Sequence, residues 1–208
     1  MKDRTPITLN RSRRVAITGV MAALTLVAYY ALVVAPNVEL GSSVLFVTGF
    51  LFGLEMALSC VLIVAGVFGL FNPWGPSIFI LEIWLAQIAG WMLFALAGHI
   101  TGIRRHERAG TTYRRQELAL MGGMLTLFYD LVTNLGWSLA SGIPYWVTLA
   151  TGLPFLVVHV VSNILIFGIV VIPLDDSVRR ALGGSLWESQ ESDESIAKNK
   201  KSVEHEQM

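Results

Sequence analysis

A carboxylate and an imidazole fall near the middle of two long apolar segments of the chain. Asp130 lies within the segment 117–140, and His159 lies within 146–172. Ionisable side chains are costly inside a bilayer and usually serve a function there. The two groups could pair with each other, hold the polar groups of a ligand, or exchange protons with a substrate. A hydrogen-bonded seam between packed helices is the structural alternative.

Polar and aromatic side chains extend from both groups along one helix face. At about 100° per residue, Asn134 and Trp137 share a helix side with Asp130. Asn163 follows His159 after four residues and therefore shares its face. Such stripes would not face lipid, so we expect them to face a cavity or a neighbouring helix. Trp137 also suits an anchoring role at the membrane surface.

The segment 77–100 places an amide between two indoles. Trp84, Gln87 and Trp91 fall within about 60° of one another on a helix. Two indoles flanking an amide could hold a flat, partly polar ring by stacking and hydrogen bonding. Anchoring at the membrane surface is the alternative for a tryptophan, and Trp91 lies too far inside the segment to suit it.

Sequence signatures of several enzyme classes are absent. The chain contains no G-x-x-x-x-G-K-[ST], no H-E-x-x-H and no G-x-S-x-G. Its single cysteine, Cys60, and the lack of zinc-ligand spacings predict neither a metal nor a cofactor. The formal net charge is zero, which argues against a nucleic-acid partner. We therefore predict a protein that is not an enzyme.

Basic residues occur in three clusters only. They are Lys2, Arg4, Arg11, Arg13 and Arg14; Arg104, Arg105, Arg108, Arg114 and Arg115; and Arg179, Arg180, Lys198, Lys200 and Lys201. Because basic residues are retained on the cytoplasmic side of a membrane, we expect all three clusters and both termini in the cytoplasm. Each basic-free stretch, 15–103 and 116–178, must then cross the membrane an even number of times.

The composition and the length of these stretches predict an all-α, polytopic membrane protein with a six-helix transmembrane bundle. The chain is 54% hydrophobic and only 14% charged, far from the soluble average. The predicted helices are 15–35, 43–53, 55–71, 77–100, 117–140 and 146–172. The second and third must be short, because residues 43–71 give about 43 Å of helix where two crossings need about 60 Å.

The predicted organisation has three parts. Residues 1–14 form a basic cytoplasmic tail, 15–174 the membrane domain and 175–208 a second cytoplasmic tail, so the protein is expected in the cell membrane. From Trp187 onward the chain has almost no apolar residue, which predicts a largely disordered tail.

The chain resembles the substrate-binding S component of an energy-coupling factor (ECF) vitamin transporter. The resemblance covers residues 11 to about 180 and rests on the six-helix arrangement and on short sequence segments. It includes R-S-R-R-V-A-I-T-G-V-M-A-A-L near the start, G-x-F-G-L-F-N-P-W-G-P in the middle and G-L-P-F-L-V-V-H-V-V-S-N-I-L near the end.

The resemblance implies a vitamin binder that works with a transmembrane coupling subunit and two ATP-binding-cassette ATPase subunits. Docking in the family uses small residues of helix one, which here maps onto Gly19, Ala22 and Ala23. The family's pocket, formed by the first outer loop and helices four to six, maps by position onto Asn37, Glu39, Trp84, Gln87, Asp130, Asn134, His159 and Asn163. Trp91, from the pair of indoles, and Trp137, from the Asp130 face, complete the predicted substrate-binding residues.

The ligand and the function class each leave alternatives. Aromatic and amide side chains suit cobalamin or a precursor, with riboflavin, thiamine and pyridoxine derivatives close behind. No basic residue lies among the mapped positions, which disfavours a phosphate ester. The other two function classes are an intramembrane enzyme using Asp130 and His159 as an acid–base pair, and a structural assembly factor.

Overall fold

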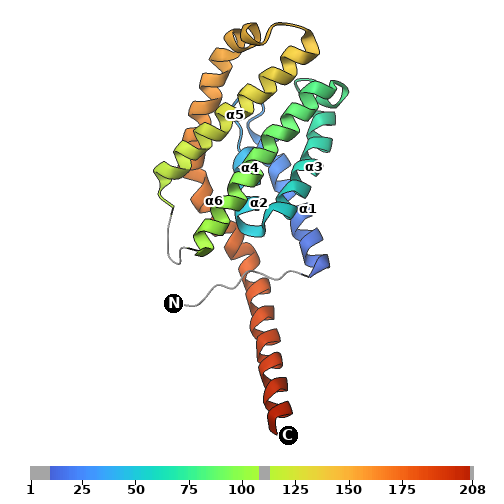
Figure 1. Ribbon diagram of the computed structural model, residues 1–208, viewed down its shortest axis with the longest axis vertical. Coiled ribbons are helices and arrows are strands. Elements are labelled where there is room, and N and C mark those ends of the chain that lie inside the picture. Colours follow the sequence, from blue (N-terminus) through green and yellow to red (C-terminus); the bar gives the residue numbers. More distant parts are fainter. Residues whose placement is uncertain (1–9, 108–112, 207–208) are drawn as a thin grey trace. The chain divides into compact units, whose positions relative to one another are not determined.

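The computed structural model describes the backbone of residues 10–107 and 113–206, with side chains for 10–104 and 113–182. Within these ranges the chain is all-α and contains no strand (Figure 1). The elements are α1 (Arg11–Ala31), α2 (Gly41–Phe52), α3 (Leu54–Phe71), the 3₁₀ turn η1 (Ser77–Phe79), α4 (Leu81–Glu107), α5 (Arg115–Ser141) and α6 (Tyr145–Glu206). Helices α1, α3, α4, α5 and α6 each contain a stretch long and apolar enough to cross a membrane. The prediction of an all-α polytopic bundle is confirmed.

Local chemistry explains where the helices begin and end. Asn10 caps α1, because its side-chain oxygen accepts a hydrogen bond from the Arg13 N–H at 2.9 Å. This cap starts α1 one turn earlier than predicted, and the helix also ends one turn earlier, before a loop at 32–40. Further along the chain, Gly142 ends α5 with a left-handed φ of 71°.

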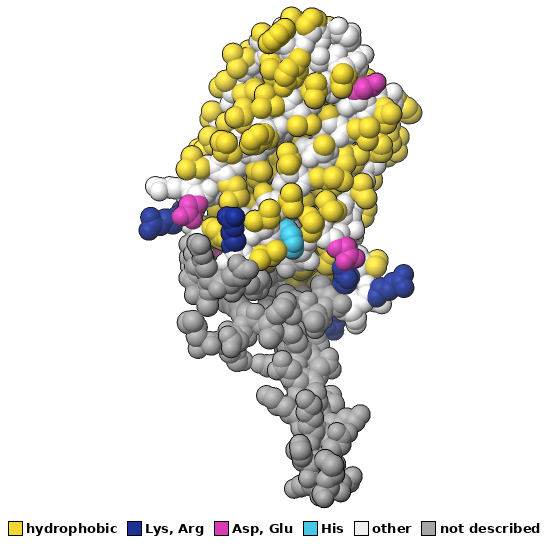
Figure 2. All heavy atoms as spheres, viewed as in Figure 1, with side chains coloured by type: hydrophobic (Ala, Val, Ile, Leu, Met, Phe, Trp, Pro, Cys, Tyr) yellow, Lys and Arg dark blue, Asp and Glu magenta, His cyan; other side chains and the backbone are white. Residues whose placement is uncertain are grey.

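Contacts between helix ends show the relative direction of α1 and α3. Arg14 at the start of α1 pairs with Glu55 at the start of α3. At their far ends, the Tyr30 hydroxyl donates a hydrogen bond to the Phe71 carbonyl at 3.2 Å, so α1 and α3 run in parallel. Figure 2 shows dark blue basic side chains toward one end of the face in view and a largely hydrophobic surface beyond them. We call the end of the bundle where α1 begins the basic end.

The short helix α2 lies inside the bundle. All its residues from Gly41 to Gly49 are buried, and it packs directly on α4. A Cβ atom added at Gly98 would collide with the Phe46 carbonyl oxygen, so glycine permits the two backbones to touch. Gly53, with φ 87°, then makes the sharp turn from α2 into α3.

The loop 32–40 explains why residues 43–71 contain less helix than two membrane crossings need. The loop enters the bundle, since the Asn37 carbonyl accepts a hydrogen bond from the Ser162 hydroxyl of α6 at 2.9 Å. Because the loop fills the part of the bundle away from the basic end, α2 spans only the remaining depth. Its 12 residues give about 18 Å at about 1.5 Å per residue.

The chain divides into two compact units after Ile172, and the second unit is Pro173–Met208. Helix α6 continues through this boundary to Glu206, where the sequence predicts a largely disordered tail. This is a difference from the prediction. Glu, Lys, Ala and Gln all favour helix by local propensity, and a helix can form from them without a core. Within this unit, Arg179 Nε donates a hydrogen bond to Asp175 Oδ1 at 2.7 Å.

Candidate functional site

A cavity of about 590 Å³ lies within the first unit, away from the basic end. The loop 32–40 and the segment after α3 contribute to its wall, together with residues of α1, α3, α4, α5 and α6. Five residues predicted to bind substrate line it: Asn37, Glu39, Gln87, Asp130 and Asn134. The other five, Trp84, Trp91, Trp137, His159 and Asn163, are not among its lining residues.

The buried residues Asp130 and His159 form a triad with the partly buried Glu39 at the wall of the cavity. His159 Nδ1 lies 2.8 Å from Asp130 Oδ1, and His159 Nε2 lies 3.5 Å from Glu39 Oε1. The His159 side chain is only 3% exposed. The three residues come from α6, α5 and the loop 32–40, so the triad connects three segments that are distant in sequence.

The position of Glu39 differs from what a residue of an outer loop suggests. Interfacial solvation is the usual state of such a carboxylate, yet the Glu39 side chain is 20% exposed and faces a histidine of α6. The loop is held in place by Ser162 and by Asn37, whose φ of 60° is the only positive value among the described non-glycine residues. Asparagine tolerates this conformation better than most residues.

Neighbouring residues of α5 and α6 hold the triad. The Asn134 side-chain NH₂ donates a hydrogen bond to the Asp130 carbonyl at 2.8 Å. A Cβ at Gly152 would lie 2.8 Å from Asn134 Oδ1, so α6 approaches α5 closely there. The Tyr129 ring meets the His159 ring edge-on, with centroids 5.7 Å apart. The imidazole therefore has little freedom to reorient.

Asn163 lies one turn from His159 but contacts another helix. It is fully buried, and its side-chain oxygen accepts a hydrogen bond from the Ser42 hydroxyl of α2 at 3.3 Å. Both His159 and Asn163 are buried, as their shared helix face predicts. Asn163 nevertheless joins α6 to α2 and does not line the cavity.

The predicted arrangement of two indoles around an amide is not what the structure builds. Trp84 Nε1 donates a hydrogen bond to the Ala65 carbonyl of α3 at 2.9 Å. Trp91 is 1% exposed and packs against Tyr29, with ring centroids 5.3 Å apart. Gln87 alone reaches the cavity, where its side-chain oxygen accepts a hydrogen bond from the Ser77 hydroxyl at 2.7 Å. Both indoles face α3 and the bundle core because α3 packs on that side of α4.

Trp137 also lies away from the cavity. It shares the general side of α5 with Asp130, but its side chain is exposed on the bundle surface. This position agrees with the alternative interpretation, anchoring at the membrane surface.

Aromatic residues that the sequence analysis missed form much of the cavity wall. Tyr29, Phe68 and Tyr129 line it, together with Trp74 and Phe155. The Tyr29 and Phe68 rings also pack against each other in a tilted arrangement, with centroids 5.3 Å apart. Two of them carried a usable signal, because Tyr129 directly precedes Asp130 and Phe155 lies four residues before His159 on the same helix face. The direction of the Tyr29 side chain depends on how α1 packs against the other helices. The apolar sequence around Tyr29 does not reveal this packing.

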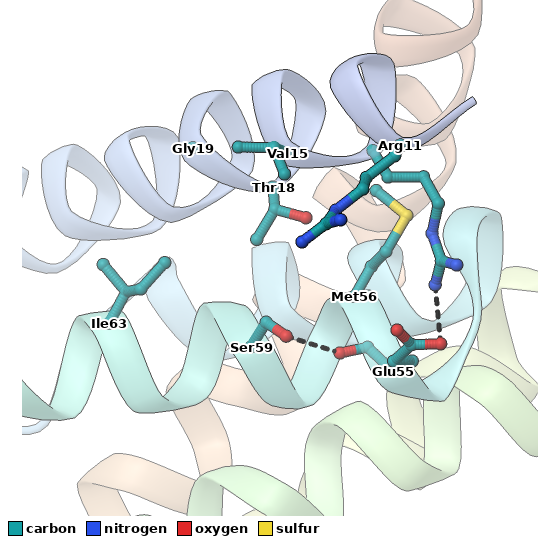
Figure 3. A pocket seen from close by; sticks show the side chains of 9 residues that line it. Arg11, Val15, Thr18, Gly19, Glu55, Met56, Ser59 and Ile63 are labelled. Atoms are coloured by element: carbon teal, nitrogen blue, oxygen red, sulfur yellow. Dashed lines mark hydrogen bonds and ion pairs between the residues drawn. The ribbon is translucent and has the colours of Figure 1, made fainter. Parts of the chain in front are cut away.

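A second hollow, of about 660 Å³, is a groove between α1 and α3 at the basic end (Figure 3). Val15, Thr18 and Gly19 of α1 face Met56, Ser59 and Ile63 of α3 across it. Of the residues predicted to dock another subunit, Gly19 and Ala23 are exposed. Ala22 is 2% exposed and packs in the core, so it does not belong to this exposed face of α1.

The groove has few close contacts of its own. Nothing lies within 4 Å of a Cβ placed at Gly19. The Arg14–Glu55 ion pair crosses one end of it, and the Ser59 hydroxyl donates a hydrogen bond to the Glu55 carbonyl at 2.9 Å. Its walls are therefore polar at the basic end and small or apolar further along α1.

In the described ranges, no group of three or more His, Cys, Asp and Glu side chains is arranged so that it could hold a metal ion. Comparison of the chain with models of protein families, with curated proteins and with solved structures found no match.

Proposed function

We propose that this chain is the substrate-capture subunit of an ECF-type vitamin uptake transporter, which binds a water-soluble vitamin and releases it into the cell. The observation that carries the proposal is the cavity of about 590 Å³ beside the Asp130–His159 pair, within a bundle of apolar helices. Pockets of about 300–1,000 Å³ typically enclose small organic ligands. Carboxylates and amides at membrane depth suit a polar solute.

The position of the cavity, away from the basic end of the bundle, supports a cavity that opens to the outside of the cell. The lining residues include Asn37 and Glu39 of the first loop and Asn72 and Trp74 after α3, all away from the basic end. Since basic residues are retained in the cytoplasm, the cavity side of a protein in the cell membrane faces outside. Both termini are then cytoplasmic.

The partners proposed are a transmembrane coupling subunit and two ATP-binding-cassette ATPase subunits. Gly19 and Ala23 leave part of α1 exposed with only small side chains. Such a surface permits the close approach of another helix in a membrane. It supports docking of the coupling subunit along α1.

The size of the cavity bears on the choice of vitamin. The abundance of aromatic and amide residues favours cobalamin or a precursor. A corrinoid, however, is larger than the drug-sized ligands that cavities of this volume enclose. The volume therefore favours riboflavin, thiamine or pyridoxine derivatives.

One observation favours a second candidate, an intramembrane enzyme. The 2.8 Å contact between Asp130 and His159 is also how a carboxylate orients a general base. Against it, Nδ1 of His159 faces Asp130 and Nε2 faces Glu39. Neither ring nitrogen is directed at a substrate in the cavity.

The test combines binding with assembly. The purified full chain is screened in detergent against a vitamin panel by thermal shift, because a ligand of the folded state raises the melting temperature. Asp130→Asn should lose the shift, and Glu82→Gln, which changes an exposed carboxylate outside the cavity, should keep it.

Three results would overturn the proposal. They are the absence of any vitamin-induced shift, the absence of coupling and ATPase subunits from the protein purified after co-expression, and chemical conversion of the bound vitamin that stops in His159→Ala while binding persists. The last result would establish the enzyme in its place.

A further inference from the structure

The charged groups of the cavity are of one sign. Glu39 and Asp130 line it, and none of its described lining residues is Lys or Arg. The sequence contains no Lys or Arg between residues 15 and 103 or between 116 and 178. No Lys or Arg of these stretches is therefore available to balance the two carboxylates, and among the described residues His159 is the one basic group that pairs with both.

His159 can balance only one of the two carboxylates. With the imidazole protonated, the triad of Glu39, Asp130 and His159 sums to one negative charge. With the imidazole neutral and both acids ionised, it sums to two. A proton shared between Asp130 and His159 leaves the pair neutral, and the charge of Glu39 then remains. An uncompensated charge at membrane depth is costly unless a counter-charge joins it.

Three polar atoms of the triad lack a hydrogen-bond partner among the described residues: Asp130 Oδ2, Glu39 Oε1 and His159 Nε2. The last two lie 3.5 Å from each other. Asp130 is 8% exposed, and its Oδ1 is occupied by His159. Its Oδ2 is buried, with no hydrogen-bond partner among the described residues. Buried carboxylate oxygens nearly always have a partner. Because Asp130 lines the cavity, a ligand inside it can supply the missing donor.

Aromatic rings surround the same space. Tyr29, Phe68, Trp74, Tyr129 and Phe155 all line the cavity. Ring faces attract a cation, most strongly where water is excluded, and they stack on flat heterocycles. The unsatisfied carboxylate and the aromatic wall therefore favour the same kind of ligand.

We infer that the cavity selects a ring-bearing organic cation, whose positive group meets Asp130 Oδ2 and the Glu39 carboxylate and whose ring stacks on the aromatic wall. The inference names the substrate class of the site and rests on the proposed function for its role in uptake. Amine-bearing or quaternary heterocycles belong to this class. Phosphate esters and carboxylate vitamins are excluded from it, because they would add like charge to the triad.

The experiment measures dissociation constants by calorimetry on the full chain in detergent at neutral pH. The cationic probes are thiamine, pyridoxamine and benzyltrimethylammonium. Riboflavin and pyridoxine serve as neutral probes, and biotin and pantothenate as anions. At least one cation should bind at least 10-fold more tightly than every neutral or anionic probe.

Charge-removing variants locate the preference. Asp130→Asn keeps the shape of the side chain and should weaken cation binding by about 10- to 100-fold. Glu39→Gln should weaken cation binding by about 10-fold. Because Glu39 lies in a loop, this substitution does not disturb the packing of α5 on α6. Neutral probes should lose less than about threefold. Glu82→Gln is the matched control, since it removes an exposed carboxylate that does not line the cavity.

The outcomes separate this inference from the proposed function. Tight binding of a neutral or anionic vitamin, unchanged in Glu39→Gln, would overturn the cation inference and leave vitamin capture standing. Binding of benzyltrimethylammonium alone would support the cation inference and count against vitamin capture. Failure of all three cations to bind would overturn the inference.

Discussion

The cavity and the groove hold charged groups in opposite circumstances. In the cavity, Asp130 and His159 are paired deep inside the bundle, with side chains 12% and 3% exposed. In the groove, the Arg14 and Glu55 side chains are 40% and 80% exposed. A buried pair is costly to break because a desolvated charge is left behind, whereas an exposed pair contributes little. The cavity therefore depends on particular residues, and the groove tolerates change.

The side chains that line the cavity also differ in kind from those that line the groove. Aromatic rings and amides surround the cavity, and they can discriminate among ligands by shape and charge. Small and aliphatic residues line most of the groove, and they can do little more than admit a helix closely. Under the proposed function, this difference assigns ligand selectivity to the cavity and docking of the coupling subunit to the groove.

The largest effect should come from breaking the buried pair. Asp130→Ala removes one partner of His159 and is expected to destabilise the bundle by about 3–5 kcal/mol. Glu55→Ala breaks the exposed pair and should cost about 0–1 kcal/mol. Thermal unfolding in detergent compares the two variants with the wild type. Equal losses would contradict the distinction between the two regions.

A smaller effect is expected from a change that reaches neither region directly. Gly98→Ala places a Cβ against the Phe46 carbonyl oxygen and forces α2 away from α4. Overpacking of this kind costs about 1–3 kcal/mol. Gly66→Ala on α3 is the control, because nothing lies within 4 Å of its Cβ position. The melting temperature should fall in Gly98→Ala only; a fall in both variants would remove the role assigned to the α2–α4 contact.

The groove can be altered without harm to the fold. Gly19→Leu introduces a side chain into open space on α1, so stability should change by no more than about 1 kcal/mol, in the direction of a gain. Vitamin binding should be unchanged, and co-purification of the coupling subunit should be lost. Gly66→Leu, equally open on α3, is the matched control. Retained co-purification in Gly19→Leu would show that docking occurs elsewhere.

The smallest effect concerns one hydroxyl of the cavity wall. The Tyr29 hydroxyl is buried without a hydrogen-bond partner in the described part of the chain. Tyr29→Phe should therefore leave the stability of the ligand-free protein unchanged or slightly raised. Calorimetry then reports whether the hydroxyl contacts the ligand, since only a direct contact would weaken binding. A clear loss of ligand-free stability would contradict the unpaired state of the hydroxyl.

The sequence by itself determined the number and alternation of the helices. A bilayer of fixed thickness requires apolar runs of a minimum length, and basic residues are excluded from them. Both constraints act along the chain and can be counted there. They also exposed the shortage of helix over residues 43–71, although not its cause. The same local reasoning found Asp130 and His159, because an ionisable residue inside an apolar run is conspicuous without knowledge of its partner.

Only the tertiary structure decided what each polar or aromatic side chain meets. Glu39 reaches His159 because the loop 32–40 enters the bundle, and the pattern of an outer loop does not reveal such a descent. Trp84 and Trp91 have the right spacing but turn toward α3 and the core. Contacts such as Ser42 with Asn163 join positions 121 residues apart. Their formation depends on the depth and rotation of whole helices, which are fixed by packing and not by the periodicity of any one segment.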